Sequence, residues 1–277
     1  MGVFKLDLIK SISIPTANLN QRELDSWLLI FFSVLYKPCE NAIENIKIAK
    51  SLGLKPVVYI NSVEPHYLKS LQELRVLILG DNKNVGLGVA FAEFEEYFLK
   101  SNQEFFIYFD QDTIVSKQAW SNILSTYREI FSNTDIGLIF YGACMQKYPS
   151  FVINSGSLFS KSILKSCGQH VKSLFVEGVD YEYCMRIRKN SKKIISIYCA
   201  GIDHESLQDS FTRSILGCQF KFRTYGLKRL FEFNKVHFRL LKIAVFSWLW
   251  PDFLFLLKSL LYFNLKEALS HILLRIS

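Results

Sequence analysis

Paired cysteines are missing from this sequence. Six cysteines are spread over 277 residues, and no two of them form a Cys-x-x-Cys pair. Their wide, irregular spacing gives little support to a structural zinc site or a disulfide framework, so we expect reduced thiols in a cytoplasmic protein. The first ten residues, MGVFKLDLIK, interrupt each apolar run with a charge, which predicts no secretory signal.

Long apolar runs without charge are also missing. The most apolar segment, 243–276, contains Pro251, Asp252 and Lys258, and no charge-free stretch reaches the roughly 18 residues that a membrane-spanning helix needs. Just before it, residues 213–242 hold eight Lys or Arg against one acid, with aromatic residues between them. This pattern is compatible with nucleic acid, but no nucleic-acid-binding fold is recognisable, so we expect no such partner.

The basic and apolar C-terminal third predicts interfacial helices instead. Trp248, Trp250 and neighbouring Leu and Phe residues would face lipid, while Lys and Arg would face anionic headgroups. This interpretation places the protein peripherally on the inner face of the cell membrane. A pair of apolar helices packed on the rest of the chain is the alternative.

The sequence does contain enough apolar material for a large core. Half of the residues are apolar, which argues against global disorder, and the length fits one large domain with an appendage. The net charge of +8 favours anionic partners such as phosphates or an anionic membrane surface.

Four apolar runs alternate with helical segments along the first 110 residues. The runs are 27–36, 55–61, 75–80 and 105–109, and they have the pattern of buried strands. Strands that alternate with helices predict an α/β fold, with a mostly parallel sheet and helices on both of its faces. Ligands of such sheets bind at the carboxyl ends of the strands.

Two carboxylates follow the fourth run directly, in FFIYFDQDTI. Asp110 and Asp112 are two residues apart, so on an extended chain both side chains point to the same side. A divalent cation such as Mg²⁺ or Mn²⁺, together with a substrate phosphate, would remove the repulsion between them. A solvated turn is one alternative. A haloacid-dehalogenase-type phosphatase is another, although Thr113 stands one place early for that motif and three strands precede it.

Six stretches together resemble one enzyme family. In chain order they are FFSVLYKP (31–38), NKNVGLGVAFA (82–92), YFDQDT (108–113), INSGSLFSKSIL (153–164), FVEGVDYEYCMRIR (175–188) and DHES (203–206). In these stretches the sequence is similar to family 2 glycosyltransferases of the GT-A fold, and in particular to the rhamnosyltransferase-like branch of bacterial surface polysaccharide synthesis.

The resemblance implies a domain organisation and an activity. Residues 27–230 would form the GT-A domain, with an N-terminal extension of unknown role at 1–26 and a C-terminal helical, membrane-associating segment at 231–277. The implied activity is inverting, metal-dependent transfer of a sugar, such as rhamnose, from a nucleotide-diphosphate donor. The acceptor would be a lipid-linked saccharide or a polysaccharide, as in O-antigen synthesis.

The resemblance also assigns a nucleotide-sugar pocket. Tyr36 would stack on or line a pyrimidine base, although plain packing also explains it. Asn61 stands nearest the place where many members carry a base-reading Asp, and this departure favours the alternative of a membrane-docked, nucleotide-sugar-binding scaffold with a degenerate site. Asn84 would contact nucleotide or sugar, and Gly86 would allow close approach of the backbone.

Metal-binding and substrate-facing residues follow from the same resemblance. Asp112 would be the chief metal ligand, and Asp110 would assist through the ribose or a metal-bound water. His204 would complete the metal or pyrophosphate site, with a structural histidine as the alternative. Gly156 would permit close approach of donor and acceptor, with an ordinary bulged strand as the alternative.

The family's catalytic base is an Asp at a helix start, followed two residues later by a second acid, and these positions correspond to Asp180 and Glu182. A carboxylate near the acceptor hydroxyl can remove its proton as the hydroxyl attacks the anomeric carbon. A helix N-terminus lowers the basicity of a carboxylate, so partial burial must oppose it. The structural alternative is an N-cap and a first-turn acid.

Overall fold

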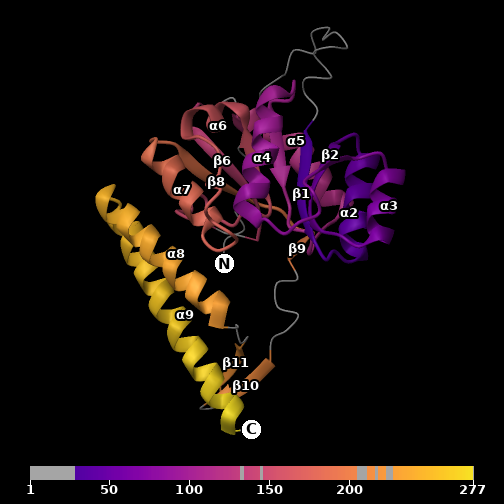
Figure 1. Ribbon diagram of the computed structural model, residues 1–277. Helices are drawn as coiled ribbons and strands as arrows, with labels where there is room; N and C mark the ends of the chain where they lie inside the picture. The colour runs from indigo at the N-terminus through magenta and orange to yellow at the C-terminus, as the bar shows by residue number, and fades with distance from the viewer. Residues whose placement is uncertain are drawn as a thin grey trace.

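The computed structural model describes residues 29–131, 134–143, 146–204, 211–215, 218–222 and 227–276. The predicted N-terminal extension, 1–26, lies outside these described residues. Figure 1 shows a layered α/β body with a long pair of C-terminal helices along one side.

A seven-stranded sheet forms the centre of the body. Its strands lie in the order β3-β2-β1-β4-β7-β6-β8, and within it β7 runs antiparallel to both of its neighbours while the other pairs are parallel. The bounds are β1 Ile30–Tyr36, β2 Lys55–Ser62, β3 Leu77–Leu79, β4 Phe105–Tyr108, β6 Ile136–Gly142, β7 Ser157–Ser160 and β8 Lys193–Tyr198. The predicted mixed, mostly parallel sheet is therefore confirmed. β3 is shorter than its predicted run because only Leu77, Ile78 and Leu79 pair with β2.

Helices cover both faces of this sheet. One face carries α2 (Glu40–Ser51), α3 (Pro65–Glu73) and α5 (Lys117–Phe131), and the other carries α4 (Leu87–Lys100), α6 (Lys161–Cys167) and α7 (Val179–Lys189). Along β1, Phe31 and Leu35 point into the first of the two cores, and Phe32 and Val34 point into the second. This double burial explains why the strand is a continuous apolar run in the sequence.

Stacked aromatic rings hold β4, the strand that leads into Asp-Gln-Asp. Phe106 of β4 stacks on Phe159 of β7 with ring centroids 4.8 Å apart, and Phe32 of β1 stacks on Phe94 of α4 at 3.8 Å. All four side chains are fully buried. Burial of one such side chain stabilises the fold by roughly 1.5–3 kcal/mol, so the residues after β4 extend from a firmly anchored strand.

Two small sheets lie outside the main one. β5 (Thr113–Val115) pairs antiparallel with β9 (Ile202–His204), and this pairing sets Thr113 opposite His204. β10 (Phe211–Ile215) and β11 (Cys218–Phe222) form an antiparallel hairpin that lies near the lower end of the helix pair in Figure 1.

The predicted C-terminal helical segment is present as a hairpin of α8 (Leu227–Phe246) and α9 (Trp250–Ile276), so its first helix begins before the boundary predicted at residue 231 (Figure 1). Leu240 and Leu256 pack with Met185 of α7 in a third core. None of the helices in the described ranges combines the length and apolarity that crossing a bilayer requires.

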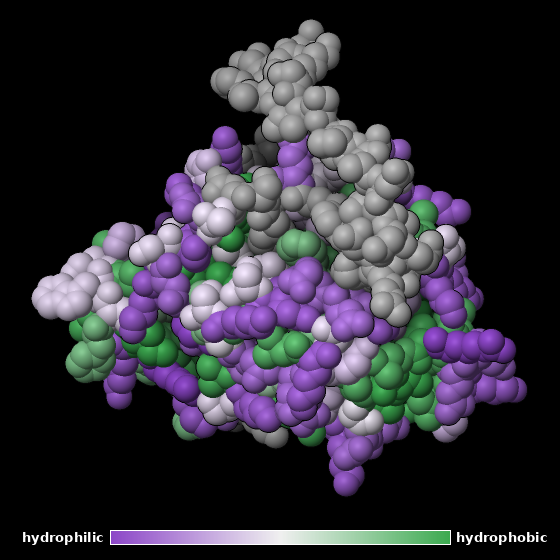
Figure 2. Space-filling view, turned by 90° about the horizontal axis from the view of Figure 1, so that it is seen from above, coloured by the Kyte–Doolittle hydropathy of each residue, from purple (hydrophilic) through white to green (hydrophobic). Residues whose placement is uncertain are grey.

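The surface seen from the top of Figure 1 is mainly hydrophilic where it is described, and its hydrophobic residues are exposed in separate patches (Figure 2). The exposed large hydrophobic side chains are instead most numerous on α8, α9 and the turn between them.

Candidate functional site

One pocket of about 610 Å³ lies where the carboxyl ends of β1, β2 and β4 meet. Residues from distant parts of the sequence converge there because parallel strands end at a common edge. Seven residues assigned from the sequence line it: Tyr36, Asn61, Asn84, Gly86, Asp110, Asp112 and His204.

Asp110 is held from two sides. The hydroxyl of Tyr108 donates a hydrogen bond to Oδ1 of Asp110 at 2.6 Å, and the backbone N–H of Asp110 donates to Oγ of Ser155 at 3.0 Å. Burial raises the pKa of Asp110, and the neighbouring Asp112 carboxylate raises it further, against the opposing effect of the Tyr108 hydrogen bond. The carboxylate is thus positioned firmly in a place that disfavours its negative charge.

Gln111, the middle residue of Asp-Gln-Asp, was not assigned from the sequence. Its side chain accepts a hydrogen bond from the backbone N–H of Tyr36 and donates one to the carbonyl of Tyr36, both at 2.7 Å. This pair of bonds ties the loop after β4 to the end of β1. The position of the predicted base-binding residue therefore depends on a residue between the two acids.

Asp110, Asp112 and His204 form a candidate cation site. One potential ligand atom from each lies within 4.8 Å of the others, and Nδ1 of His204 is 3.6 Å from Oδ1 of Asp112. Carboxylate oxygens suit Mg²⁺ and Mn²⁺, and an imidazole nitrogen can add to such a set. A divalent cation would offset the charge that makes the ionised form of Asp110 unfavourable, so these residues fit the metal predicted from the sequence.

A chain of hydroxyl groups orients His204. Oγ1 of Thr113 lies 2.8 Å from Nδ1 of His204 and 2.7 Å from Oγ of Ser155, which also accepts the hydrogen bond from Asp110. Thr113 is fully buried, and the pairing of β5 with β9 places it opposite the histidine. Such outer contacts fix the ring orientation of a metal-binding histidine.

Thr113→Val should weaken Mn²⁺ binding by about 10–100-fold, because it removes the group that orients His204. It should also lower the free energy of unfolding by roughly 1–3 kcal/mol, since the buried hydroxyl of Ser155 and the ring of His204 each lose a hydrogen bond. Isothermal titration calorimetry and urea unfolding measure the two effects. Thr113→Ser keeps the hydroxyl and should behave like the unaltered protein. Equal Mn²⁺ affinity in all three proteins would contradict this role.

Hydrogen bonds hold the loop before α4 in place. Asn61 accepts from the backbone N–H of Val85 at 3.2 Å and donates to the carbonyl of Gly86 at 3.4 Å, while Oδ1 of Asn84 accepts from the N–H of Gly86 at 3.2 Å. Gly86 has a φ of +84°, and a Cβ there would lie 2.5 Å from the carbonyl oxygen of Phe175. Asn61 thus connects β2 to this loop while it lines the pocket.

Asp180 lies at the start of α7 and lines a second pocket, of about 240 Å³. Asp110, Val176 and His204 line both pockets, so the two cavities border each other. Burial raises the pKa of Asp180 to about 7, against the hydrogen bond that the N–H of Tyr181 donates to Oδ1 at 2.9 Å. Burial therefore outweighs the effect of the helix start, and the carboxylate is suited to accept a proton near neutral pH.

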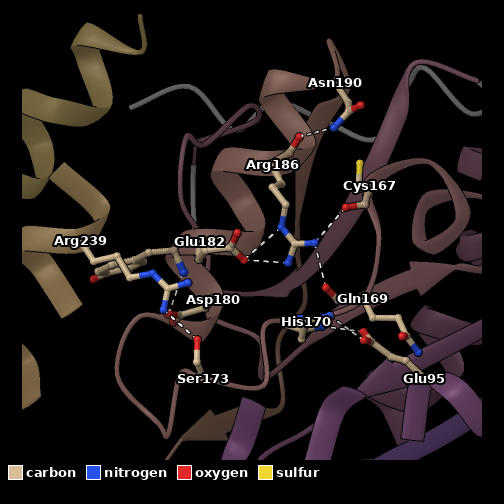
Figure 3. Close-up of polar contacts among 11 residues, drawn as sticks. Glu95, Cys167, Gln169, His170, Ser173, Asp180, Glu182, Arg186, Asn190 and Arg239 are labelled. Atoms are coloured by element: carbon tan, nitrogen blue, oxygen red, sulfur yellow. Dashed lines mark hydrogen bonds and ion pairs between the residues drawn. The ribbon is translucent and has the colours of Figure 1, made fainter. Parts of the chain in front are cut away.

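The structure does not bring Glu182 to either pocket lining. Oε2 of Glu182 lies 2.7 Å from Nη2 of Arg186, which is directed at it in Figure 3. The same guanidinium donates to the carbonyl oxygens of Cys167 and Gln169, both at 2.8 Å. Glu182 thus belongs to a partly buried network that fastens α7 to the loop after α6.

Gly156 lies beneath the first pocket and is not among its lining residues. Its backbone N–H donates to the carbonyl of Tyr108 at 2.8 Å, and its φ is +90°. A Cβ there would lie 2.2 Å from the carbonyl oxygen of Tyr141. The observed reason for a glycine at this position is therefore the close packing of the chain beside β4 and β6.

Arg229 is a pocket residue that the sequence did not reveal. It lines the first pocket, and its Nε lies 2.9 Å from Oε1 of Glu177, which lines the second. The sequence predicts that the basic residues of this region face lipid headgroups, and no local motif distinguishes Arg229 from them. Only the placement of α8 beside the pockets reveals it.

Comparisons with known proteins give similarity of architecture only. No family model matches the sequence, and no curated protein matches it. Among solved structures, TarS 1–349 of S. aureus aligns over 62% of this chain and 60% of its own, with 15% identity and a TM-score of 0.47. The complex of TarS 1–349 with UDP-GlcNAc aligns over 79% and 66%, with 13% identity and a TM-score of 0.47. An inositol-1-phosphate CTP transferase from T. maritima aligns over 62% and 85%, with 11% identity and a TM-score of 0.40.

The chain spans less than two thirds of the TarS fragment that it resembles. Similarity at this level of identity leaves the ligands of TarS as properties of TarS, and nothing in it supports the rhamnosyltransferase-like branch. The family and the roles of the site residues predicted from the sequence stay predictions.

Proposed function

We propose that this chain is an inverting, metal-dependent glycosyltransferase that takes a sugar from a nucleotide-diphosphate donor. The observation that carries the proposal is the juxtaposition of two pockets that share Asp110 and His204. The larger holds the candidate cation site, and the smaller holds Asp180, a carboxylate whose pKa is raised to about 7. Transfer of a glycosyl group needs both an anion-neutralising site and a separate base.

The larger pocket is the donor site in this proposal. Tyr36, at the end of β1, lines it and is exposed, so its ring is available to a nucleobase. Asp112, Asp110 and His204 would hold Mg²⁺ or Mn²⁺, which when bound would neutralise the charge of the leaving diphosphate. Arg229, in the same lining, places a guanidinium on the side of α8, where Glu177 pairs with it.

The smaller pocket is the acceptor site. Tyr181 and Phe233 supply aromatic walls, and the buried amide nitrogen of Asn154 has no hydrogen-bond partner among the described residues. A carboxylate oxygen of Asp180 would take the proton of the acceptor hydroxyl. At the same time the hydroxyl oxygen would bond to the anomeric carbon, and the bond from that carbon to the nucleotide diphosphate would break. One such displacement inverts the anomeric configuration.

The finer identities rest on sequence resemblance alone. We assign the donor base to the pyrimidines, the sugar to hexoses such as rhamnose, and the acceptor to a saccharide carried on a lipid or a growing polysaccharide. The second candidate, a nucleotide-sugar-binding scaffold, is favoured by one observation: the polar atoms of Asn61 are occupied by loop contacts where a base-reading group is expected.

A donor screen tests the proposal. Purified protein is incubated with Mn²⁺, UDP- or dTDP-sugars and saccharide acceptors, and the products are identified by mass spectrometry. We expect an acceptor that gains the mass of one sugar, with free nucleotide diphosphate, and no reaction when the cation is chelated. Tight nucleotide-sugar binding without any product from a broad panel would favour the scaffold.

A further inference from the structure

The two sides of α8 have opposite character. Phe233, Leu240 and Ala244 recur at helical spacing and are buried against α7 and α9. Lys235 and Lys242 lie between them in the sequence and are exposed. One face of α8 therefore packs against the rest of the protein, and the other faces outward.

The outward face contains a groove of about 600 Å³ at the C-terminal ends of α7 and α8. Four of its residues are cationic and the others are mostly apolar: Lys189, Lys235, Phe238, Arg239, Lys242, Ile243, Phe246 and Ser247. Cations and aromatic rings in one groove match a ligand that has a phosphate group joined to hydrocarbon.

The acids of the hairpin do not neutralise this face. Asp252 is 1% exposed and is bound to Arg188 by two hydrogen bonds, and Glu267 is 3% exposed. Of the acidic side chains described on α8 and α9, that of Glu232 is the most exposed, at 40%, and its carboxylate lies 3.7 Å from Nζ of Lys235. The exposed charge of the described hairpin is therefore predominantly positive, with Lys258 on α9 adding to it.

Large exposed apolar side chains lie at the end of α8, where Phe246 lines the groove, and in the residues that follow. Phe246 is 82% exposed and Trp248, in the turn between the helices, is 78% exposed. Trp250 at the start of α9 is also exposed, and its ring is 6.3 Å from that of Trp248. Tryptophan side chains gather at the boundary between lipid headgroups and acyl chains.

We infer that the α8–α9 hairpin docks on the surface of an anionic phospholipid bilayer. Headgroup phosphates bind to Lys235, Arg239 and Lys242 in the groove, and Phe246 and Trp248 enter the region between headgroups and acyl chains. The bilayer matches both the cationic and the apolar side chains of this surface. Nucleic acid would leave the exposed aromatic and aliphatic side chains of α9 in water. The inference does not depend on the proposed transfer activity.

The same helix connects the membrane face to the second pocket. Phe233 and His237, on the buried side of α8, line the pocket that contains Asp180, while Lys235 and Arg239 lie on the outward side. Docking through the groove would therefore place the second pocket within one helix diameter of the lipid surface, about 10 Å.

Vesicle flotation with the full-length protein tests this docking. We expect the protein to float with phosphatidylcholine vesicles that contain phosphatidylglycerol, and much less with phosphatidylcholine alone. Each cation near an anionic surface contributes about fivefold to binding, so Lys235→Ala with Lys242→Ala should lower the partition coefficient roughly thirtyfold. Binding should also fall as salt is raised, because the Debye length shortens from about 10 Å at 0.1 M to about 3 Å at 1 M.

Matched control variants test whether flotation depends on this surface or only on the overall charge and hydrophobicity of the protein. Lys47→Ala with Lys69→Ala removes the same charge from α2 and α3, where each lysine also lies near a glutamate, and should leave flotation unchanged. Phe246→Ser should reduce flotation, whereas Tyr198→Ser, at a 63% exposed ring on β8, should not. Circular dichroism and thermal unfolding establish that each variant is folded.

Three outcomes would overturn the inference. They are equal binding to neutral and anionic vesicles, flotation of the Lys235/Lys242 variant like the unaltered protein, and absence of flotation. In the last case, sedimentation that shows a dimer disrupted by Phe246→Ser would assign the face to a second copy of the chain. A gel shift with RNA that is lost in the lysine variant would assign it to nucleic acid.

Discussion

Asp180→Asn should lower the rate of sugar transfer by about 10²–10⁴-fold and leave donor binding unchanged. The amide keeps the size of the side chain but cannot accept the proton of the acceptor hydroxyl. Because Asp180 lines the second pocket and not the first, the affinity for nucleotide and cation should persist. Product formation gives the rate, and calorimetry with Mn²⁺ and UDP or dTDP gives the affinity.

The pH dependence of the rate should report the same carboxylate. Burial raises the pKa of Asp180 to about 7, and only the ionised form can act as a base. Transfer should therefore increase as the pH rises from about 6 to about 8, with its midpoint near 7. The residual activity of Asp180→Asn should lack this step.

The stability of the unaltered protein should change with pH in the opposite sense to its rate. The folded protein holds the Asp180 proton up to a pH of about 7, whereas the ordinary value for an aspartate is 3.8. Between these values the unfolded state releases a proton that the folded state keeps, so the folded protein loses stability as the pH rises. Asn carries no such penalty. In chelator, Asp180→Asn should be more stable than the unaltered protein at pH 8, by up to about 4 kcal/mol, and this gain should vanish at pH 4.

The control for Asp180→Asn is Asp135→Asn. Asp135 precedes β6, at the amino end of that strand, and its carboxylate lies 3.8 Å from Lys193 on the surface. Its replacement should leave both the rate and its pH profile unchanged. Transfer by Asp180→Asn at the unaltered rate would remove Asp180 from the role of base.

Asp112→Ala should abolish the cation-dependent binding of nucleotide, with a loss of affinity of about 100-fold or more, and transfer should be lost with it. Loss of an outer partner of a metal ligand costs about 10–100-fold, so loss of a ligand should cost at least as much. Oδ1 of Asp112 lies 3.6 Å from Nδ1 of His204, and Asp112 offers one of the three potential ligand atoms of the candidate cation site. Titration of UDP or dTDP with Mn²⁺, and again with chelator, gives the cation-dependent part.

Asp203→Ala is the matched control for Asp112→Ala. Asp203 precedes His204 on β9, so its side chain points to the opposite face of the strand, and it belongs to neither pocket lining. Nucleotide affinity should be unchanged in this variant. If Asp112→Ala bound nucleotide with Mn²⁺ as tightly as the unaltered protein, the cation site would have to lie elsewhere.

Local patterns in the sequence predict the strands and the position of the two acids after β4. A strand buried on both faces must be apolar throughout, so β1, β2 and β4 are visible as apolar runs without knowledge of the fold. The alternation of strands with helices then implies that these strands are parallel and end at a common edge. The convergence of Tyr36, Asn61 and Asp110 at one pocket follows from that rule.

The partners of side chains between distant segments could not be predicted in this way. Asp180 and Glu182 are both acids in the first turn of α7, and Arg186 stands four residues after Glu182 as a local partner, but nothing local shows that Asp180 borders a cavity. Similarly, Thr113 meets His204 only because β5 pairs with β9 across a separation of 91 residues.

Apolar periodicity and charge thus establish from the sequence that this chain forms a mostly parallel sheet, with acids at its ligand edge and a basic, apolar C-terminal segment. These properties are local, because each depends on whether neighbouring residues are hydrophobic or hydrophilic. The assignment of Arg229 to the pocket, the chain from Asp110 through Ser155 and Thr113 to His204, and the raised pKa of Asp180 depend on the folded chain. Each arises from burial and contact between segments far apart in sequence, which no single stretch of residues encodes.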